Sequence, residues 1–184
     1  VLAIGKQIQP AVVKMTGGYS GHHSGTGSLI TPDGYIITNA HVVENATDVK
    51  IELFDGREYV AEVIGTTFPE NQPDLALLKI EAENLPWISL ANGVSVGDTI
   101  IGVGHPHNLE WVIWGGLITY MDPGSAETPH ELKMEYQDNA VPVGTGSSGS
   151  PIVNLGGKIV GIKNSTATDF TIPSEQLWLR DEWL

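Results

Sequence analysis

Short apolar segments separated by turn signals recur along the whole chain, and this pattern limits the fold more than any other feature of the sequence. Within one of them, Val49, Ile51 and Leu53 alternate with Lys50 and Glu52. A period of two residues is typical of a strand with one buried face. Because many such segments follow at near-regular spacing, with almost no helical periodicity, the sequence predicts an all-β fold of barrels or sandwiches.

The expected strands are "TGSLI", "YIITN", "VKIELF", "REYVAEVI", "DLALLKI", "DTIIGVG", "WVIWGGLITY", "LKMEY", "SPIVN" and "KIVGIKN". Turn signals lie between them, as in "TPDG" at 31–34. The one segment expected to be helical is 174–184, where Ser174 can cap the first turn after Pro173. The segment 85–98 is the best candidate for a connection between two halves of the chain.

The stretch "GTGSSGSPIV" at 144–153 satisfies two motifs that imply different chemistry. Its glycines fit the G-x-G-x-x-G fingerprint for dinucleotides, but that site needs a following helix. Here two β-branched runs flank a Gly-Gly dipeptide, which is typical of a tight hairpin and leaves no room for a helix. The second motif is G-x-S-G-x-P, where a tight turn around Ser148 can present backbone N–H groups as an oxyanion hole. Alone, the stretch is also typical of an ordinary loop, so the catalytic interpretation needs a base and an acid elsewhere.

Two residues at strand ends can supply that base and acid. His41 directly follows the expected strand "YIITNA", and Asp74 opens "DLALLKI" after Pro73. A histidine at a strand end can act as a general base, and a carboxylate that opens a strand can be partly buried and still reach the imidazole. His41, Asp74 and Ser148 occur in the chain order of the chymotrypsin arrangement, which differs from that of subtilisin and of the α/β-hydrolases.

With these stretches in place, the chain resembles a trypsin-like serine protease of the chymotrypsin fold, and most closely the protease domain of the HtrA (Deg) family. The matching segments are "GTGSLITPDGYIITNAHVV", "DLALLKI", "VGDTIIGVGHPHNLEW", "GGLIT", "GSSGSPIVNLGGKIVGI" and "IPSEQL". The resemblance implies two six-stranded antiparallel β-barrels followed by a short C-terminal helix. We expect an N-terminal barrel at 1–90 with the histidine and aspartate, a C-terminal barrel at 91–173 with the serine, and the helix at 174–184.

The serine motif departs from the usual family form. HtrA proteases usually carry G-N-S-G-G-P, whereas this chain has Ser147 before the nucleophile and Ser150 after Gly149. The G-x-S-G-S-P form resembles that of glutamyl endopeptidases. The family's usual peptide-binding PDZ module is also not expected, because the sequence ends at Leu184.

The resemblance and the chemistry together assign roles to the central residues. We expect His41 to deprotonate Ser148 while Asp74 orients and stabilises the imidazole. The backbone N–H groups of Gly146 and Ser148 are expected to bind the oxyanion. An alternative is a catalytically silent barrel that binds peptides, although such a scaffold would have no physical need for these three residue types at these positions.

Further residues are expected to contact the substrate. Thr145 is expected to shape the serine loop, and the backbone of Asn164 and Ser165 to pair with an extended peptide. Pro142 and Val143 are expected along the wall and base of the specificity pocket, where no acid is present to bind Arg or Lys.

Two preferences remain open for the residue before the scissile bond. Apolar walls favour a small or medium aliphatic side chain, as in the HtrA family. Lys163 occupies the place where glutamyl endopeptidases have a pocket histidine, so an inward ammonium would favour Glu or Asp. We expect the aliphatic preference, with Lys163 extending to solvent, because lysines are rarely buried without a partner.

No metal or other cofactor is expected. With no cysteine there is no thiolate zinc site, and the pairs His22-His23 and His105-x-His107 lack an evident third ligand. We expect 105–107 to be a plain loop, and Trp111 and Trp114 to pack against the core.

The charge of the chain restricts its partners. The net charge of -13, with only 9 Lys plus Arg, disfavours nucleic acid and anionic lipid and leaves a polypeptide substrate as the expected partner. No apolar run is long enough for a membrane span, and the first residues lack the pattern of a signal peptide. Family resemblance implies an extracytoplasmic or secreted location. We expect a monomer rather than a family-type trimer, because residues 1–18 contain no aromatic side chain.

Overall fold

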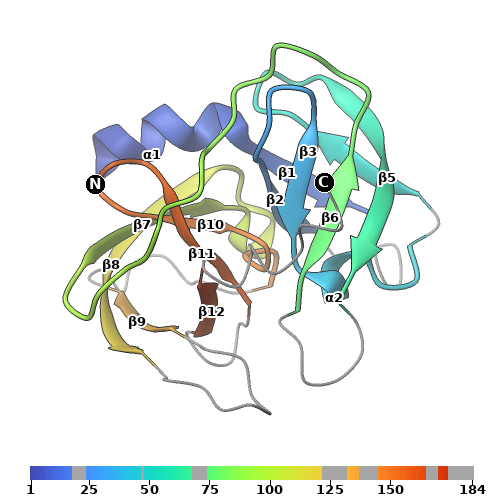
Figure 1. Ribbon diagram of the computed structural model, residues 1–184. Coiled ribbons are helices and arrows are strands. Elements are labelled where there is room, and N and C mark those ends of the chain that lie inside the picture. Colours follow the sequence, from blue (N-terminus) through green and yellow to red (C-terminus); the bar gives the residue numbers. More distant parts are fainter. Residues whose placement is uncertain are drawn as a thin grey trace.

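The computed structural model describes residues 1–17, 24–46, 48–67, 74–121, 132–136, 145–164 and 170–173. Its strands form two closed antiparallel barrels that lie side by side (Figure 1). The prediction of an all-β double barrel is therefore confirmed. Among the described residues, no helix is long and apolar enough to cross a membrane.

The first barrel contains the N-terminal strands. They are β1 (Val12–Thr16), β2 (Gly25–Leu29), β3 (Tyr35–Thr38), β4 (Val49–Glu52), β5 (Glu58–Thr66) and β6 (Ala76–Lys79), and they close in the order β1-β2-β3-β6-β5-β4. Val49 and Ile51 of β4 are buried and Lys50 is exposed, as the alternation predicts. This inward alternation fills the barrel with aliphatic side chains.

The second barrel contains the C-terminal strands. They are β7 (Thr99–Gly104), β8 (Val112–Met121), β9 (Leu132–Tyr136), β10 (Pro151–Val153), β11 (Ile159–Lys163) and β12 (Phe170–Pro173), in the order β10-β11-β12-β9-β8-β7. The predicted hairpin joins β10 to β11: the N–H of Asn154 donates to the carbonyl of Lys158 at 3.0 Å, and Gly157 has φ +70. This hairpin follows the serine motif directly.

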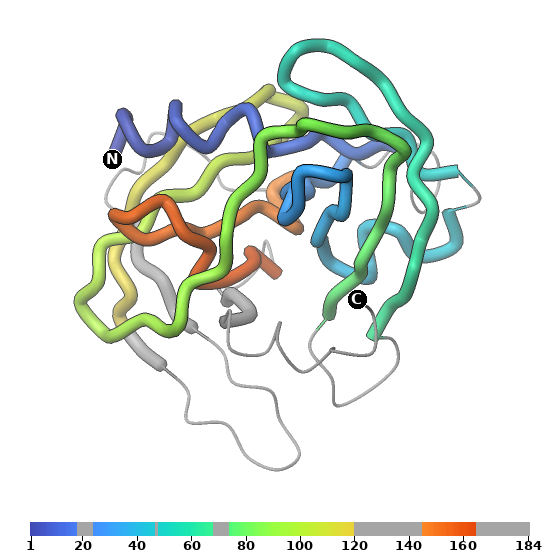
Figure 2. Tube along the Cα trace, turned by 45° about the horizontal axis from the view of Figure 1, so that its top comes forward, coloured from blue at the N-terminus to red at the C-terminus, as the bar shows by residue number. Residues whose placement is uncertain are grey.

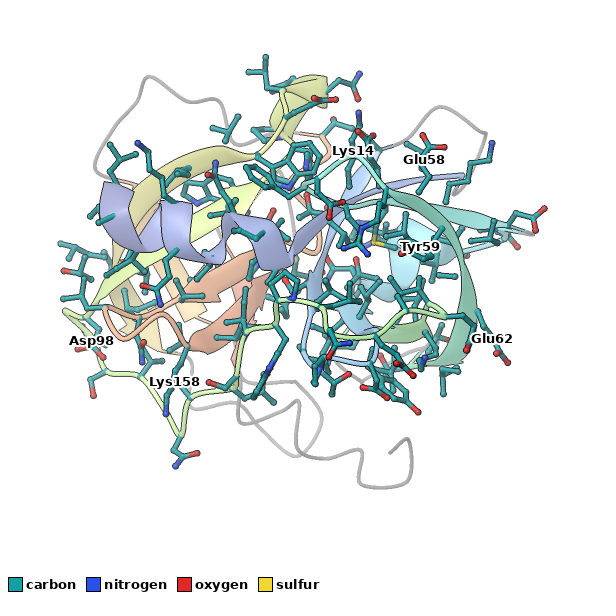
Figure 3. All side chains as sticks on the ribbon, turned by 90° about the horizontal axis from the view of Figure 1, so that it is seen from above. Lys14, Glu58, Tyr59, Glu62, Asp98 and Lys158 are labelled. Carbon is teal, nitrogen blue, oxygen red and sulfur yellow. The ribbon has the colours of Figure 1, made fainter. Side chains whose placement is uncertain are left out.

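The helices lie elsewhere than expected. α1 (Leu2–Ile8) continues into the 3-10 turn η1 (Gln9–Ala11), and α2 (Ala40–Val43) and the 3-10 turn η3 (Pro106–Asn108) follow later in the chain. Seen from above, α1 lies over the second barrel, away from Tyr59 and Glu62 of β5 (Figure 3). The expectation that only the C-terminal segment is helical is wrong, and 174–184 lies outside the described residues.

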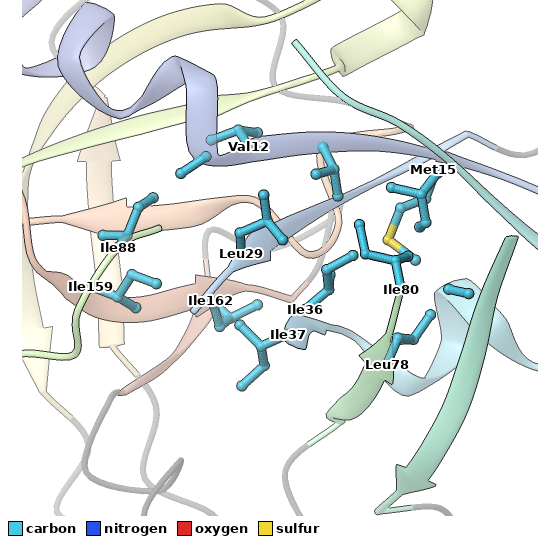
Figure 4. Packing of buried hydrophobic residues seen from close by; sticks show 14 of the residues in the cluster. Val12, Met15, Leu29, Ile36, Ile37, Leu78, Ile80, Ile88, Ile159 and Ile162 are labelled. Carbon is cyan, nitrogen blue, oxygen red and sulfur yellow. The ribbon is translucent and has the colours of Figure 1, made fainter. Parts of the chain in front are cut away.

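The segment 80–98 connects the barrels (Figure 2), and its backbone hydrogen-bonds to both. The N–H of Ile88 donates to Leu29 of β2 at 2.9 Å, and the N–H of Ile159 in β11 donates to Ser89 at 2.9 Å. One cluster of buried side chains includes Leu29 from the first barrel and Ile162 from the second (Figure 4). The two barrels therefore share a continuous apolar core, which holds their facing loops in a fixed relation.

Candidate active site

His41 and Asp74 are brought together by two neighbouring strands of the first barrel. Thr38, at the end of β3, pairs with Ala76, at the start of β6, so the residue that follows β3 meets the residue that precedes β6. His41 lies on the single turn α2, and the backbone N–H of His41 donates to Oδ1 of Asp74 at 2.9 Å. The imidazole Nδ1 contacts Oδ2 of the same carboxylate. Both oxygens of Asp74 thus fix the backbone and the ring of His41.

The backbone of Asp74 is also held. Asn39 lies just before α2, and its side-chain Nδ2 donates to the carbonyl of Asp74 at 2.8 Å. The imidazole of His41 is 40% exposed and the carboxylate of Asp74 is 20% exposed. The ring therefore turns one edge to the protein and keeps the other accessible, which is the arrangement that an acid–base catalyst needs.

Ser148 lies in the tight turn before β10, against the first barrel. The N–H of Thr26 in β2 donates to the carbonyl of Ser148 at 2.9 Å, and the N–H of Gly149 donates to Lys163 of β11 at 2.8 Å. A Cβ on Gly149 would overlap the Thr26 carbonyl and the Thr38 hydroxyl. The serine turn therefore packs between the barrels, against the strand that leads into His41.

The backbone of the serine turn is held peptide by peptide. The carbonyl of Thr145 accepts the N–H of His107 at 2.7 Å, and the carbonyl of Ser147 accepts the N–H of Ser150 at 3.1 Å. The N–H groups of Gly146 and Ser148, in contrast, have no acceptor in the part of the chain that the structure describes. Two backbone donors near one serine hydroxyl can bind an oxyanion.

His105 was not expected at the site. It is completely buried, its Nδ1 lies 3.1 Å from Oγ1 of Thr26, and its ring meets the indole of Trp111 edge to face. Burial is the main cause that lowers the pKa of His105 to about 4; the positive charge of Lys14 acts in the same direction and Glu110 opposes them. The imidazole is thus neutral at neutral pH.

The structure also separates the predicted histidine pair. His107 is exposed on η3, whereas His105 is buried and bonded to Thr26, so the two rings lie in different surroundings. Trp114 is buried, as expected, and the indole N–H of Trp111 donates to Val12 of β1 at 2.9 Å. The pair His22-His23 lies outside the described residues.

Lys163 differs from the expectation. We expected it to extend to solvent, and instead only 1% of its surface is exposed. Every residue of β11 is buried, Lys163 at its end included. The lysine backbone lies against the serine turn, because its N–H donates to Ser150 at 2.9 Å and its carbonyl accepts from Gly149. The expected route to solvent is therefore wrong.

The remaining predicted substrate contacts are placed in part. Thr145 is exposed at the start of the serine turn, and Asn164 is half-buried directly after β11. Pro142, Val143 and Ser165 lie outside the described residues. Sequence reasoning missed Thr26, which reads as an ordinary strand residue in "TGSLI", and no local signal marks its contacts with the serine turn.

Curated relatives match most of this chain. It is 35% identical over 146 residues to a probable periplasmic serine endoprotease DegP-like of Halomonas elongata, with 78% of this chain and 30% of the relative covered. It is 35% identical over 164 residues to a protein of the same description from Chlamydia pneumoniae, with 82% and 32% covered. The chain thus spans about a third of the length of these relatives.

Solved structures match the fold. The serine endoprotease from Yersinia pestis has a TM-score of 0.80 at 28% identity, with 97% of this chain and 64% of that chain covered. The HtrA-type protease AlgW with a decapeptide has a TM-score of 0.80 at 21% identity, with 98% and 66% covered, and it supports the fold alone. The family model for the trypsin-like peptidase domain matches residues 25–162. This chain therefore belongs to the trypsin-like peptidase family, and within it is HtrA-like.

Proposed function

We propose that this chain is a serine endopeptidase in which Ser148 is the nucleophile, His41 the general base and Asp74 the residue that orients the base. The observation that carries the proposal is the double contact of the Asp74 carboxylate with the backbone and the ring of His41. With Nδ1–H directed at Asp74, the other ring nitrogen is the one that can take a proton. The description of the curated relatives as serine endoproteases supports the same activity.

The reaction proceeds by acyl transfer. Oγ of Ser148 attacks the substrate carbonyl carbon while its proton passes to Nε2 of His41. The resulting oxyanion accepts hydrogen bonds from the N–H groups of Gly146 and Ser148, and such a donor typically contributes about 3 to 4 kcal/mol. His41 then gives the proton to the leaving amine, and water releases the acyl group by the reverse sequence of proton transfers.

A fluorophosphonate probe tests the nucleophile directly. We expect stoichiometric labelling of Ser148 in the wild type and none in Ser148→Ala, with His41→Ala strongly slowed because the base is missing. The rate of hydrolysis of an unstructured protein such as casein should likewise be highest in the wild type, strongly reduced in His41→Ala and lost in Ser148→Ala. A wild-type chain that neither reacts with the probe nor cleaves casein would favour the silent peptide-binding barrel.

Extended substrates are proposed to bind beside β11. The half-buried Asn164 follows that strand, and the exposed Thr145 opens the serine turn. A peptide that adds a strand here would bind through its backbone, with specificity set by the side chain before the scissile bond. Asn164, Ser165, Thr145, Pro142 and Val143 remain proposed contacts.

The burial of Lys163 favours a second candidate for specificity. An aliphatic preference was expected from apolar pocket walls, as in the HtrA family, together with a Lys163 that reaches solvent, and the structure contradicts the last of these. An ammonium in a low-dielectric surrounding strongly attracts a carboxylate. Because the Lys163 backbone hydrogen-bonds to both Gly149 and Ser150 beside the nucleophile, we propose a preference for Glu or Asp before the scissile bond, with the aliphatic preference as the alternative.

Matched peptides ending in Val, Leu, Glu or Arg separate these candidates. We expect the highest kcat/KM for Glu in the wild type and loss of that advantage in Lys163→Met, which keeps the length of the side chain and removes its charge. Preference for Val or Leu in both proteins would establish the aliphatic alternative. Efficient cleavage after Arg would exclude both.

We also propose an extracytoplasmic location. The curated relatives are described as periplasmic, and the chain has no cysteine that a change in redox environment would affect. Immunodetection after cell fractionation tests this proposal, and a signal confined to the cytoplasm would contradict it.

A further inference from the structure

The hydroxyl of Thr26 lies at the centre of a hydrogen-bond network that joins the two barrels. Thr26 belongs to β2 of the first barrel and is completely buried. Its Oγ1 donates to the carbonyl of Gly146 at 2.8 Å, in the serine turn of the second barrel. It also accepts the backbone N–H of His105 at 3.2 Å and lies 3.1 Å from Nδ1 of the same histidine.

The chemistry of the groups determines which atom carries each proton. A carbonyl oxygen can only accept, so the single hydroxyl proton of Thr26 points at Gly146. Toward His105 the hydroxyl can therefore only accept, which requires the proton on Nδ1 of the imidazole. The hydroxyl then donates once and accepts twice, so it cannot rotate without losing bonds in a buried place.

Two bonds together determine the orientation of Gly146. In a trans peptide the N–H points opposite to the preceding carbonyl, so the bond from His107 to the Thr145 carbonyl sets the direction of the Gly146 N–H. The bond from Thr26 holds the next peptide plane through the Gly146 carbonyl. Gly146 has φ +95, and a Cβ there would overlap the carbonyl of His105, so only glycine fits between these two bonds.

We propose that Thr26, held by His105, is a positioning residue that keeps the Gly146 N–H directed at the developing oxyanion. The inference rests on the proposed function, because it assigns the Gly146 N–H to the oxyanion hole. The Thr26 side chain acts separately from its backbone, whose N–H donates to the carbonyl of Ser148 whatever the side chain is. Removing the hydroxyl should therefore loosen the oxyanion donor and leave the nucleophile in place.

Thr26→Val removes the hydroxyl and keeps the shape of the side chain. We expect kcat to fall about 10- to 100-fold, while KM changes by less than about twofold. This loss in kcat does not exceed that caused by removing one oxyanion donor, because the donor is loosened and not deleted. The affinity of a peptide boronate, which mimics the tetrahedral state, should fall by the same factor as kcat. Thr26→Ser restores the donor and should recover most of kcat.

Ser28 provides a matched control on the same strand. It is completely buried, and its hydroxyl has no partner among the described residues. Ser28→Ala removes a hydroxyl from β2 without touching the network, so kcat and boronate affinity should stay at the wild-type values.

The outcomes separate the inference from the proposed function. If the wild type cleaves peptides and Thr26→Val is equally fast, or if only KM rises, the positioning role is wrong. If the wild type does not cleave peptides or label at Ser148, the proposed function fails first. If Thr26→Val does not fold, Thr26→Cys and Thr26→Ser can be compared instead. A thiol is a weaker hydrogen-bond donor than a hydroxyl, so we expect a lower kcat in Thr26→Cys. Equal kcat in these two variants would overturn the inference.

Discussion

The neutral imidazole of His105 makes the stability of the chain depend on pH. Burial is the largest cause that lowers its pKa to about 4 from the ordinary value of 6.5, and the charge of Lys14 adds to it. Since Nδ1 already donates to Thr26, a second proton would go to Nε2, which is buried and has no partner among the described residues. A charged His105 would therefore be unfavourable in the folded chain.

The sign of the effect follows from proton binding. Between pH 6.5 and 4 the unfolded chain binds a proton at His105 that the folded chain does not, so stability falls as the pH drops through this window. This difference in pKa lowers the free energy of unfolding by about 3 kcal/mol once the pH is below both the folded and the unfolded pKa. Above pH 6.5 the protonation of His105 does not change the free energy of unfolding, because the imidazole is neutral in both states.

His105→Asn tests this dependence, because an amide can still donate to Thr26 and does not titrate. From urea unfolding at pH 7 and pH 4.5, we expect the wild type to lose about 2 kcal/mol more than the variant. His107→Asn, which changes an exposed histidine two residues away, should keep the wild-type loss. Equal losses in the wild type and His105→Asn would contradict a buried neutral imidazole.

At the level of residues, candidate site residues next to strand ends were predicted from the sequence, whereas the contacts of residues within strands were missed. His41 and Asp74 were found because each adjoins a recognisable strand, and the structure brings them into contact. Thr26 was missed because its partners His105 and Gly146 are 79 and 120 positions away in the chain. Such contacts depend on how the barrels meet, which no local pattern records. The burial of Lys163 depends on the same tertiary packing.

The turn around Gly149 is restricted by its surroundings as well as by its backbone conformation. Gly149 and Gly56 both have φ +84, but a Cβ on Gly149 would overlap Thr26 and Thr38, whereas nothing lies within 4 Å of a Cβ on Gly56. The two glycines therefore share the same backbone requirement and differ in the space around them.

Substituting each glycine by alanine separates these two effects. Gly56→Ala should cost about 1 to 2 kcal/mol of unfolding free energy, the penalty for a left-handed residue. Gly149→Ala should cost at least about 3 kcal/mol and abolish phosphonate labelling, because the overlap forces the serine turn away from β2. Urea unfolding measures both, and similar costs for the two variants would show that the turn can shift.

At the level of elements, the strands with clear alternation or turn boundaries were predicted, and others were not. β1 begins with Val12 and Val13, which are both buried, so the two-residue period is lost. α1 contains Gly5, and glycine lowers helix propensity, so this segment was not recognised as helical from the sequence. The structure gives its reason: a Cβ on Gly5 would overlap Ile113 of β8, so the glycine lets α1 pack closely on the second barrel.

The whole molecule depends on the shared core between the barrels. The double-barrel architecture could be predicted from the resemblance, but the interlocking of the two barrels appears only in the structure. Val12, Leu29, Ile88, Ile159 and Ile162 belong to one buried cluster that draws on both barrels and the connection between them (Figure 4). The expected monomer stays a prediction, which sedimentation analysis would test.

This shared core predicts that the two barrels unfold together. The five tryptophans, Trp87, Trp111, Trp114, Trp178 and Trp183, all follow the first barrel in sequence, but the indole of Trp111 donates to Val12 of β1. The test therefore uses a Trp111→Phe background, in which the remaining tryptophans belong to the connection and the C-terminal half of the sequence. Leu29→Ala opens a cavity in the first barrel, where the side chain is completely buried, and should cost about 2 to 5 kcal/mol. If folding is cooperative, the urea midpoint must fall equally by tryptophan fluorescence and by circular dichroism, although the cavity lies outside the tryptophan-containing half.

Val60→Ala, on the exposed face of β5, should leave both midpoints nearly unchanged. A fluorescence midpoint that stays at the wild-type value in Leu29→Ala would mean that the second barrel folds independently, and the buried cluster would then join two separate cooperative units.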